Sequence, residues 1–173
     1  MRRLVFFIGL LALAMPVSLA SAKHAPVNHV SGDVTLEFPR GDSDQIMFDV
    51  TGDPLSTAAS GSFHKHSVFH EVLGIVEIDM TGLVDCLRVV GDTAYMSGVI
   101  TASMGTVPPG TPFFQSVRDT SPAGTGDTVS ATFVGAGATC FLSEPPEFVI
   151  ASGNIVIEQC DWINGSGKCK TKD

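Results

Sequence analysis

Residues Leu73–Thr101 read LGIVEIDMTGLVDCLRVVGDTAYMSGVIT, and this stretch decides the fold. Apolar and polar residues alternate from Val76 to Thr81, which is the period-two pattern of a strand with one buried face. Two further apolar runs, 86–90 and 94–101, are separated by Gly91-Asp92. Glycine takes a positive φ readily, so this dipeptide predicts a tight two-residue hairpin turn. The stretch therefore predicts three consecutive antiparallel β-segments joined by short turns.

Similar short segments recur along the rest of the chain, separated by Gly- and Pro-rich connections. No apolar stripe at helical spacing persists over eleven residues, whereas regularly spaced short strands are typical of sandwiches and barrels. We therefore expect an all-β, single-domain antiparallel β-sandwich or small β-barrel of about eight strands. The polar stretch 23–32 predicts a loose lead-in. The other candidate strands are 33–38, 46–51, 60–69, 113–118, 129–133 and 153–159.

The first 22 residues have the features of a secretory signal peptide. Arg2 and Arg3 precede an apolar run, Leu4–Val17, and Ala20-Ser21-Ala22 is a small-residue cleavage site. The apolar run is too short for a stable membrane span. We therefore expect export to the extracellular space or periplasm, no membrane span after cleavage, and a single mature β domain over residues 23–173.

The chain is acidic, and removal of the leader makes it more so. Its formal charge is −8, and cleavage removes Arg2 and Arg3 but none of the eighteen acidic residues, giving −10. This charge argues against nucleic acid and anionic membranes as partners. The expected partner is an extracellular ligand or protein whose identity the sequence does not give.

The chain has four cysteines, Cys86, Cys140, Cys160 and Cys169. In an exported chain an even number of cysteines predicts disulfides, here with three possible connectivities. The last two bracket a short stretch with an Asn164-Gly165 turn, so we expect them to close a C-terminal loop over residues 160–173. Cys86 is then expected to meet Cys140 across the sheet. A zinc knuckle would need Cys-x-x-Cys spacing, which is absent.

An ordered set of strand and turn segments comprises Ser60–His64, Val84–Gly91, Ala94–Thr101, Phe114–Asp119, Pro122–Asp127 and Gly153–Ile155. Taken together, these segments resemble a group of secreted bacterial β-rich proteins of actinobacterial type. The group shares a Cys-Leu-x-Val-x-Gly hairpin, then Val-x-Asp, then a Pro/Gly loop ending in Asp. The resemblance implies a β-rich fold and an exported location, and it implies no activity, because the shared motifs are strand and turn positions.

Three histidines form the first candidate metal site. His64 and His66 are two residues apart, so in a strand their imidazoles point to the same face and could share a zinc or copper ion. His70 could fold back from the following turn, and Glu71 could complete the ligand set. The alternative is that the three histidines simply face solvent.

The loop from Asp119 to Asp127 is a candidate calcium site, because it offers carboxylate, hydroxyl and carbonyl oxygens. It lacks the Asp-x-Asp-x-Asp-Gly spacing of a dedicated calcium loop. The alternative is structural: Asp119 closes one strand as an Asx-turn residue, and Asp127 opens the next. Apart from these zinc, copper or calcium hypotheses, we expect no cofactor.

An enzymatic role has little support in the sequence. There is no Gly-x-Ser-x-Gly elbow, and every histidine precedes residue 71. The acid pairs Asp42/Asp44 and Glu144/Glu147 lie in loop-like sequence, where exposed carboxylates are common. We expect a non-catalytic binding or structural module. The alternatives are a metal-binding protein that uses the histidines and a small extracellular hydrolase.

Two adjacent aromatic residues, Phe113-Phe114, place one ring on each face of a predicted strand. Both rings cannot enter the same core. Either layers of the protein cover both faces of this strand, or one ring lies on a binding surface.

Overall fold

The computed structural model of this protein describes residues 27–105, 107–120, 124–163 and 166–170. The expected leader, residues 1–22, lies outside them. The described residues contain β-strands and no helix. The strands are β1 (Asn28–Glu37), β2 (Ser43–Gly52), β3 (Ala58–Glu71), β4 (Gly74–Val90), β5 (Thr93–Met104), β6 (Pro112–Arg118), β7 (Thr128–Val129), β8 (Phe133–Val134), β9 (Phe148–Val149), β10 (Ser152–Ile163) and β11 (Ser166–Lys170).

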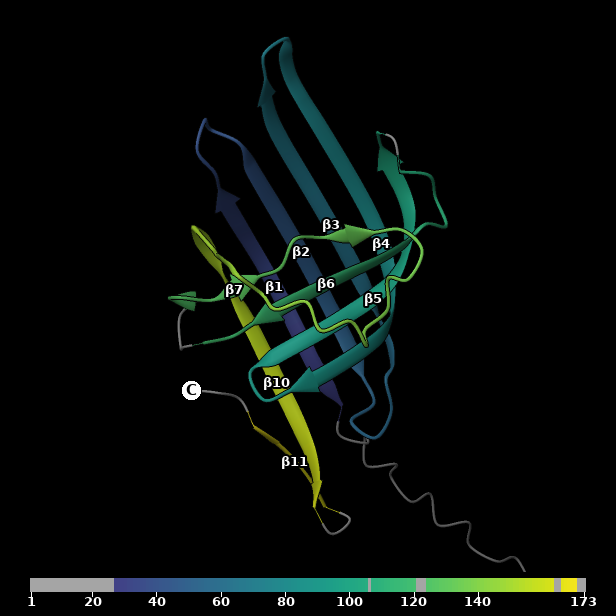
Figure 1. Ribbon diagram of the computed structural model, residues 1–173. Coiled ribbons are helices and arrows are strands. Elements are labelled where there is room, and N and C mark those ends of the chain that lie inside the picture. Colours follow the sequence, from purple (N-terminus) through teal and green to yellow (C-terminus); the bar gives the residue numbers. More distant parts are fainter. Residues whose placement is uncertain (1–26, 106, 121–123, 164–165, 171–173) are drawn as a thin grey trace, which may run out of the picture.

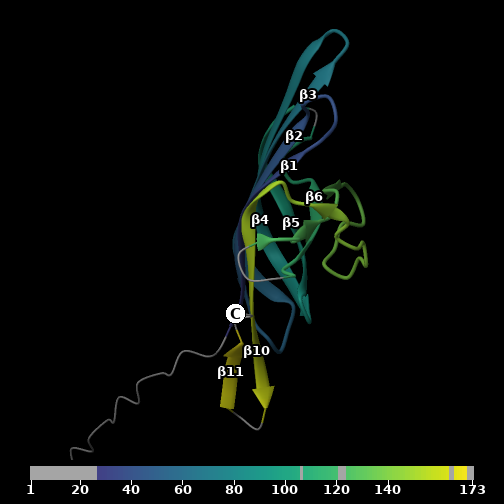
Figure 2. The same cartoon turned by 90° about the vertical axis from the view of Figure 1, so that its left-hand side faces the viewer.

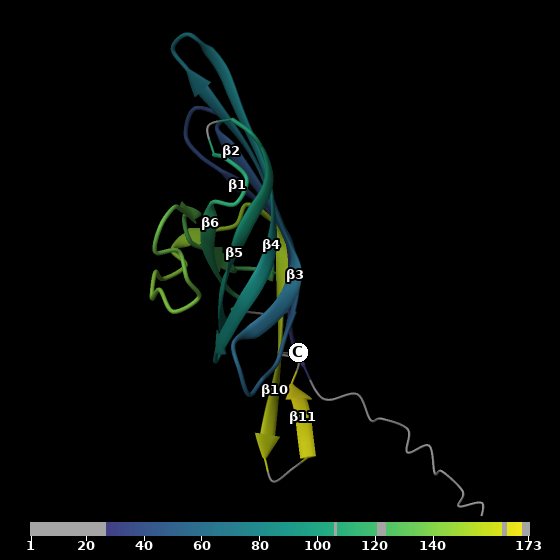
Figure 3. The same ribbon diagram turned by 90° about the vertical axis from the view of Figure 1, so that its right-hand side faces the viewer.

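All of these strands belong to one antiparallel sheet, in the order β11-β10-β1-β2-β3-β4-β5-β6-β7-β9, with β8 also paired to β6 (Figure 1). The sheet curls so that β5 and β6 lie in front of β1–β4, which makes a half-barrel (Figures 2 and 3). The predicted all-β antiparallel domain is confirmed. Of the two predicted architectures, the single curled sheet is closer to a barrel than to a sandwich of two separate sheets.

The core fills the hollow of the half-barrel, as strand periodicity requires. Alternate residues of β1 and β2 point inward, among them Val30, Val34, Ile46 and Val50, all with no exposed surface. Full burial of one such side chain stabilises the fold by about 1.5–3 kcal/mol. Across the hollow, the ring of Phe63 stacks on that of Phe113 with centroids 4.5 Å apart, which joins β3 to β6.

The stretch 73–101 forms a hairpin, but with two strands rather than three. Its first two predicted segments are a single strand, β4, whose pairing with β5 shifts register between Thr81 and Gly82 and between Val84 and Cys86. The extra residues at these bulges let the long strand continue where separate segments were expected. The predicted turn is confirmed: Gly91 has φ of 63°, and Val90 pairs directly with Thr93.

Two other local predictions were wrong. The lead-in is not loose throughout, because β1 begins at Asn28 and pairs with both β2 and β10. The alternating stretch 129–133 is not one strand. Only Thr128–Val129 and Phe133–Val134 form strand pairs with β6. Between them the Ser130 N–H donates to the Ser116 carbonyl at 2.9 Å, and the side chains of Gln115 and Ser130 make the other bonds.

Strand β6 is covered on both faces, which explains the paired phenylalanines. Phe113 faces the core, whereas Phe114 faces the opposite side, and both are fully buried. The polypeptide after β8 covers Phe114, and in Figures 2 and 3 this green segment lies outside β6. The first of the two sequence-based alternatives, layers on both faces, is therefore the observed one.

The predicted disulfide between Cys86 and Cys140 is present and fastens the covering segment to β4. Cys160 is also disulfide-bonded. The backbone register of β10 and β11 places Cys160 opposite Cys169. The C-terminal part expected to be a loop is thus a hairpin, and its expected turn, Asn164-Gly165, lies outside the described residues.

Candidate functional site

A cavity of about 470 Å³ lies between the outer face of β6 and the segment that covers it. Its volume falls within the range of small-molecule sites in proteins, and its lining is mainly apolar, which is also typical of such sites. The lining residues are Phe114, Ala131, Thr132, Phe133, Ala136, Gly137, Leu142 and Glu144.

Phe114 forms a fixed apolar surface of the cavity, because β6 holds it in the sheet and its side chain has no exposed surface. Phe133, in β8, is 46% exposed and stands where the cavity meets solvent. Beside Phe114, the Ser116 hydroxyl donates a hydrogen bond of 2.7 Å to the Glu144 carbonyl. This bond fastens the covering segment to β6 next to the cavity.

Arg88, from the outer face of β4, anchors the covering segment at a second place. Its Nε donates to the Cys140 carbonyl at 3.0 Å, and its Nη2 donates to the Leu142 carbonyl at 3.2 Å. The guanidinium also lies over the Tyr95 ring, 4.1 Å from the centroid. Together with the Cys86–Cys140 disulfide, these contacts hold the cavity wall in place without a regular strand ladder.

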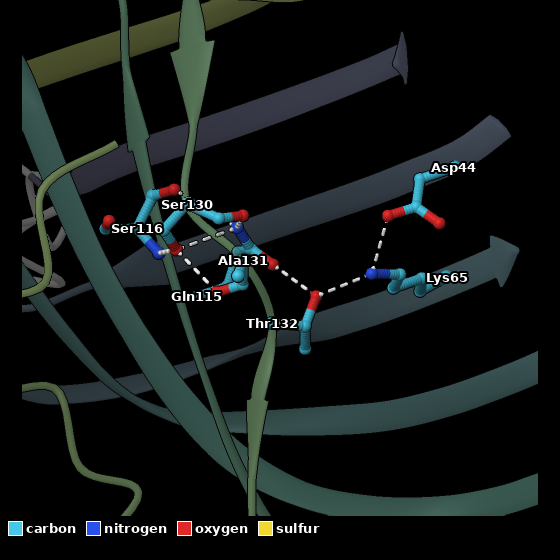
Figure 4. Close-up of polar contacts among 7 residues, drawn as sticks. All are labelled: Asp44, Lys65, Gln115, Ser116, Ser130, Ala131 and Thr132. Carbon is cyan, nitrogen blue, oxygen red and sulfur yellow. Dashed lines mark hydrogen bonds and ion pairs between the residues drawn. The ribbon is translucent and has the colours of Figure 1, made fainter. Parts of the chain in front are cut away.

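A polar network runs from the cavity into the hollow of the half-barrel (Figure 4). Thr132, which lines the cavity, donates a hydrogen bond of 2.7 Å to Gln115 Oε1 and accepts one of 3.3 Å from Lys65 Nζ. The Gln115 amide nitrogen donates to the Ser130 carbonyl at 2.8 Å. The fully buried Gln115 is therefore satisfied at both ends, as a buried amide requires.

The network ends in a buried ion pair. Lys65 Nζ lies 2.8 Å from Asp44 Oδ2, and the two side chains are only 12% and 10% exposed. The other Asp44 oxygen has no hydrogen-bond partner among the described residues. The sequence suggested that Asp42 and Asp44 are paired acids of one turn, and this was wrong for Asp44, which is the second residue of β2 and points inward.

His64 and His66 lie on the same face of β3, as predicted, and both approach Asp79 of β4. His64 Nε2 is 3.0 Å and His66 Nδ1 is 3.4 Å from the same oxygen, Asp79 Oδ2. Hydrogen bonding and charge from His64, and secondarily from His66, hold the pKa of the Asp79 carboxyl below its usual value. The two histidines therefore cluster around one carboxylate.

His70 is not part of this cluster. Its backbone N–H donates to Asp42 Oδ1, and its ring Nδ1 lies 3.4 Å from the same atom. In a strand, four residues separate His66 from His70 by roughly 13 Å, and Glu71 lies still further along β3. Within the described parts of the chain, no three His, Cys, Asp or Glu side chains are arranged to hold one metal ion. Metal binding by the histidines remains an untested hypothesis.

Asp119 and Asp127 are brought together, but they bind backbone amides. Asp127, fully buried, accepts hydrogen bonds from the N–H groups of Thr120 and Ile155, both at 2.9 Å. Asp119 accepts one of 3.2 Å from the N–H of Ile157. Both carboxylates therefore bond the backbone of the fold, Asp119 that of β10, and the predicted Asx turn of Asp119 and calcium binding by the loop remain untested.

Sequence reasoning missed Lys65, Gln115, Ser130 and Thr132. A signal for Lys65 was available, since it shares the face of β3 that carries the buried Phe63. The other three lie in or beside β6, where successive residues are all buried and the period-two pattern disappears.

No protein-family model, curated protein or solved structure matches this chain. The resemblance to secreted actinobacterial-type proteins is therefore still a prediction. The described residues include no helix with the length and apolar character needed to cross a bilayer.

Proposed function

We propose that this chain is an exported, non-catalytic binding module that takes a small, mainly apolar ligand in the cavity beside Phe114. The observation that carries the proposal is the cavity itself, about 470 Å³ in volume and lined largely by aromatic and aliphatic groups. Few polar groups accompany this lining, mainly Thr132 and Glu144. A small number of polar groups in an apolar pocket is enough to orient a ligand.

A binding role fits the chemistry of the lining better than catalysis does. Glu144 is the only titratable residue among those that line the cavity. Two serines bonded to this region, Ser116 and Ser130, donate their hydroxyl protons to the carbonyls of Glu144 and Ala131. A nucleophilic serine would instead need an adjacent base to take its proton.

The proposed export is supported by the leader sequence and by the disulfide between Cys86 and Cys140. Disulfides persist mainly in oxidising compartments outside the cytosol. A binding module whose pocket wall is held by a disulfide suits such a compartment, because the disulfide stays intact there and keeps the pocket in shape without a partner protein.

The proposal is tested with a neutral apolar dye, Nile red, whose fluorescence rises in apolar surroundings. We expect saturable binding. The Ala136→Trp substitution fills the cavity from an exposed position and should raise the Kd at least about tenfold, which corresponds to about 1.4 kcal/mol. Ala151→Trp, at an exposed position outside the lining, is the matched control and should leave the Kd unchanged. Absence of saturable binding, or equal Kd values for both variants, would contradict the proposal.

A further inference from the structure

The hairpin formed by β3 and β4 extends beyond its neighbours and projects from one end of the half-barrel (Figure 1). The pairing of β2 with β3 ends at Val68, and that of β5 with β4 ends at Asp79. Beyond these residues, within the part of the chain that the structure describes, the two strands pair only with each other, up to Glu71 opposite Gly74. Among the described residues, the outer edge of each strand therefore has no neighbouring strand here.

The two edges differ. On β3, the outward N–H of His70 donates to the Asp42 carboxylate from the β1–β2 turn, so this edge is blocked. His70 lies opposite Ile75 in a regular antiparallel ladder, so Ile75 also points its backbone N–H and C=O outward, as does Glu77 two residues on. No other strand of the described chain pairs with these outward groups.

The free edge also carries exposed apolar side chains. Ile75 is 63% exposed and Val76 45%, and at the tip Leu73 is fully exposed. Met104, at the end of β5 beside this edge, is 68% exposed. No lysine or arginine lies between residues 66 and 87, whereas Glu71, Glu77 and Asp79 do, so an anionic membrane is a poor partner for this hairpin.

We infer that the edge of β4 at Ile75–Glu77 pairs antiparallel with the same edge of a second copy of this chain. A twofold axis through Val76 places Ile75 of each copy opposite Glu77 of the other, so their outward N–H and C=O groups form hydrogen bonds in both directions. The two Val76 side chains then face each other as a non-hydrogen-bonded pair, about 4.5–5.5 Å apart at Cβ.

This register also keeps the two Glu77 side chains from lying directly opposite each other. Glu77 lies directly opposite Ile75 rather than opposite the second Glu77, so no like charges are directly paired. The register stops before Asp79, whose outer edge pairs with Met104 of β5, so the paired segment is Ile75–Glu77.

The test is the oligomeric state of the chain, measured by sedimentation equilibrium over a series of concentrations. We expect a monomer–dimer equilibrium, because so small an interface gives a weak association. Val76→Lys places two ammonium groups face to face and should abolish the dimer. Val72→Ser, at the tip outside the pairing, is the matched control and should leave the dimer intact. Circular dichroism checks that both variants are folded.

A second measurement locates the axis. Oxidation of a Val76→Cys variant should give a disulfide-linked dimer on a non-reducing gel, whereas Val72→Cys should stay monomeric. A monomer at every concentration would overturn the inference, as would loss of the dimer in Val72→Ser with its retention in Val76→Lys. Flotation of the chain with neutral phosphatidylcholine vesicles, reduced by Val72→Ser, would assign the hairpin to a membrane instead.

Discussion

The carboxylate of Asp127 accepts a hydrogen bond of 2.9 Å from the backbone N–H of Ile155. Asp127 directly precedes β7, near one end of the sheet, and Ile155 lies in β10, near the other. At this point β10 pairs with β1 on one side only. Asp119 bonds Ile157 two residues along in the same way. Two carboxylates, rather than a strand ladder, therefore join the ends of the half-barrel.

Loss of the Asp127 carboxylate should be severely destabilising. Asp127→Ala leaves two backbone N–H groups without a partner, and hydrogen bonds to charged groups contribute about 1.5–3 kcal/mol each. We expect the free energy of unfolding to fall by roughly 2–5 kcal/mol in urea denaturation. The control, Asp85→Ala, removes an exposed carboxylate from β4 and should change it by less than about 0.5 kcal/mol.

The hydrogen bonds that Asp127 accepts also predict how the chain responds to the removal of calcium. The Asp127 oxygens already accept hydrogen bonds from N–H groups, which compete with a cation for the same lone pairs. We expect EDTA to leave the Tm of the chain unchanged. A fall in Tm with EDTA that calcium reverses, and that Asp127→Asn abolishes, would show instead that the loop is a calcium site.

The sequence predicted those features that have a regular alternation of apolar and polar side chains, or a residue type with a particular structural role, such as glycine or cysteine. Alternation identified β4 and β5, Gly91 identified their turn, and cysteine spacing identified the Cys86–Cys140 pair. The cavity could not be predicted, because side-chain bonds and a disulfide hold its wall, and these leave no periodic pattern. Asp44 was misassigned because the turn-forming residues 39–44 include it, and a charged residue in a turn is expected to be exposed.

The ion pair of Lys65 and Asp44 gives a prediction about stability. Removal of one partner leaves the other charge buried and unpaired, which typically costs about 3–5 kcal/mol. We expect Lys65→Met and Asp44→Leu each to lower the free energy of unfolding by this amount in urea. The double variant should recover most of the loss, because no unpaired charge remains. If each single variant loses less than about 1 kcal/mol, the pair behaves as an exposed one.

The cluster around Asp79 predicts a pH dependence of stability. Its folded-state pKa is lowered from 3.8 by His64 and His66. The stabilising contribution is therefore fully present above pH 3.8 and is lost as the pH falls from 3.8 through the lower folded-state pKa. His64→Ala should weaken this acid-side loss, measured as the free energy of unfolding against pH, whereas His70→Ala should not. An unchanged profile for His64→Ala would show that the pair contributes nothing to stability.

The contacts that hold the cavity wall link stability to ligand affinity. Cys86 and Cys140 are 54 residues apart, and loss of such a disulfide typically costs about 2–5 kcal/mol. We expect the double variant Cys86→Ala/Cys140→Ala to be less stable and to bind Nile red more weakly.

Arg88→Lys should weaken Nile red binding with a smaller loss of stability. Lysine cannot reproduce the two parallel guanidinium hydrogen bonds to the Cys140 and Leu142 carbonyls. Arg118→Lys is the control, since Arg118 bonds Thr93 and none of the residues that line the cavity. If the dye binds the Arg88→Lys and Arg118→Lys variants equally well, the wall does not depend on the Arg88 contacts.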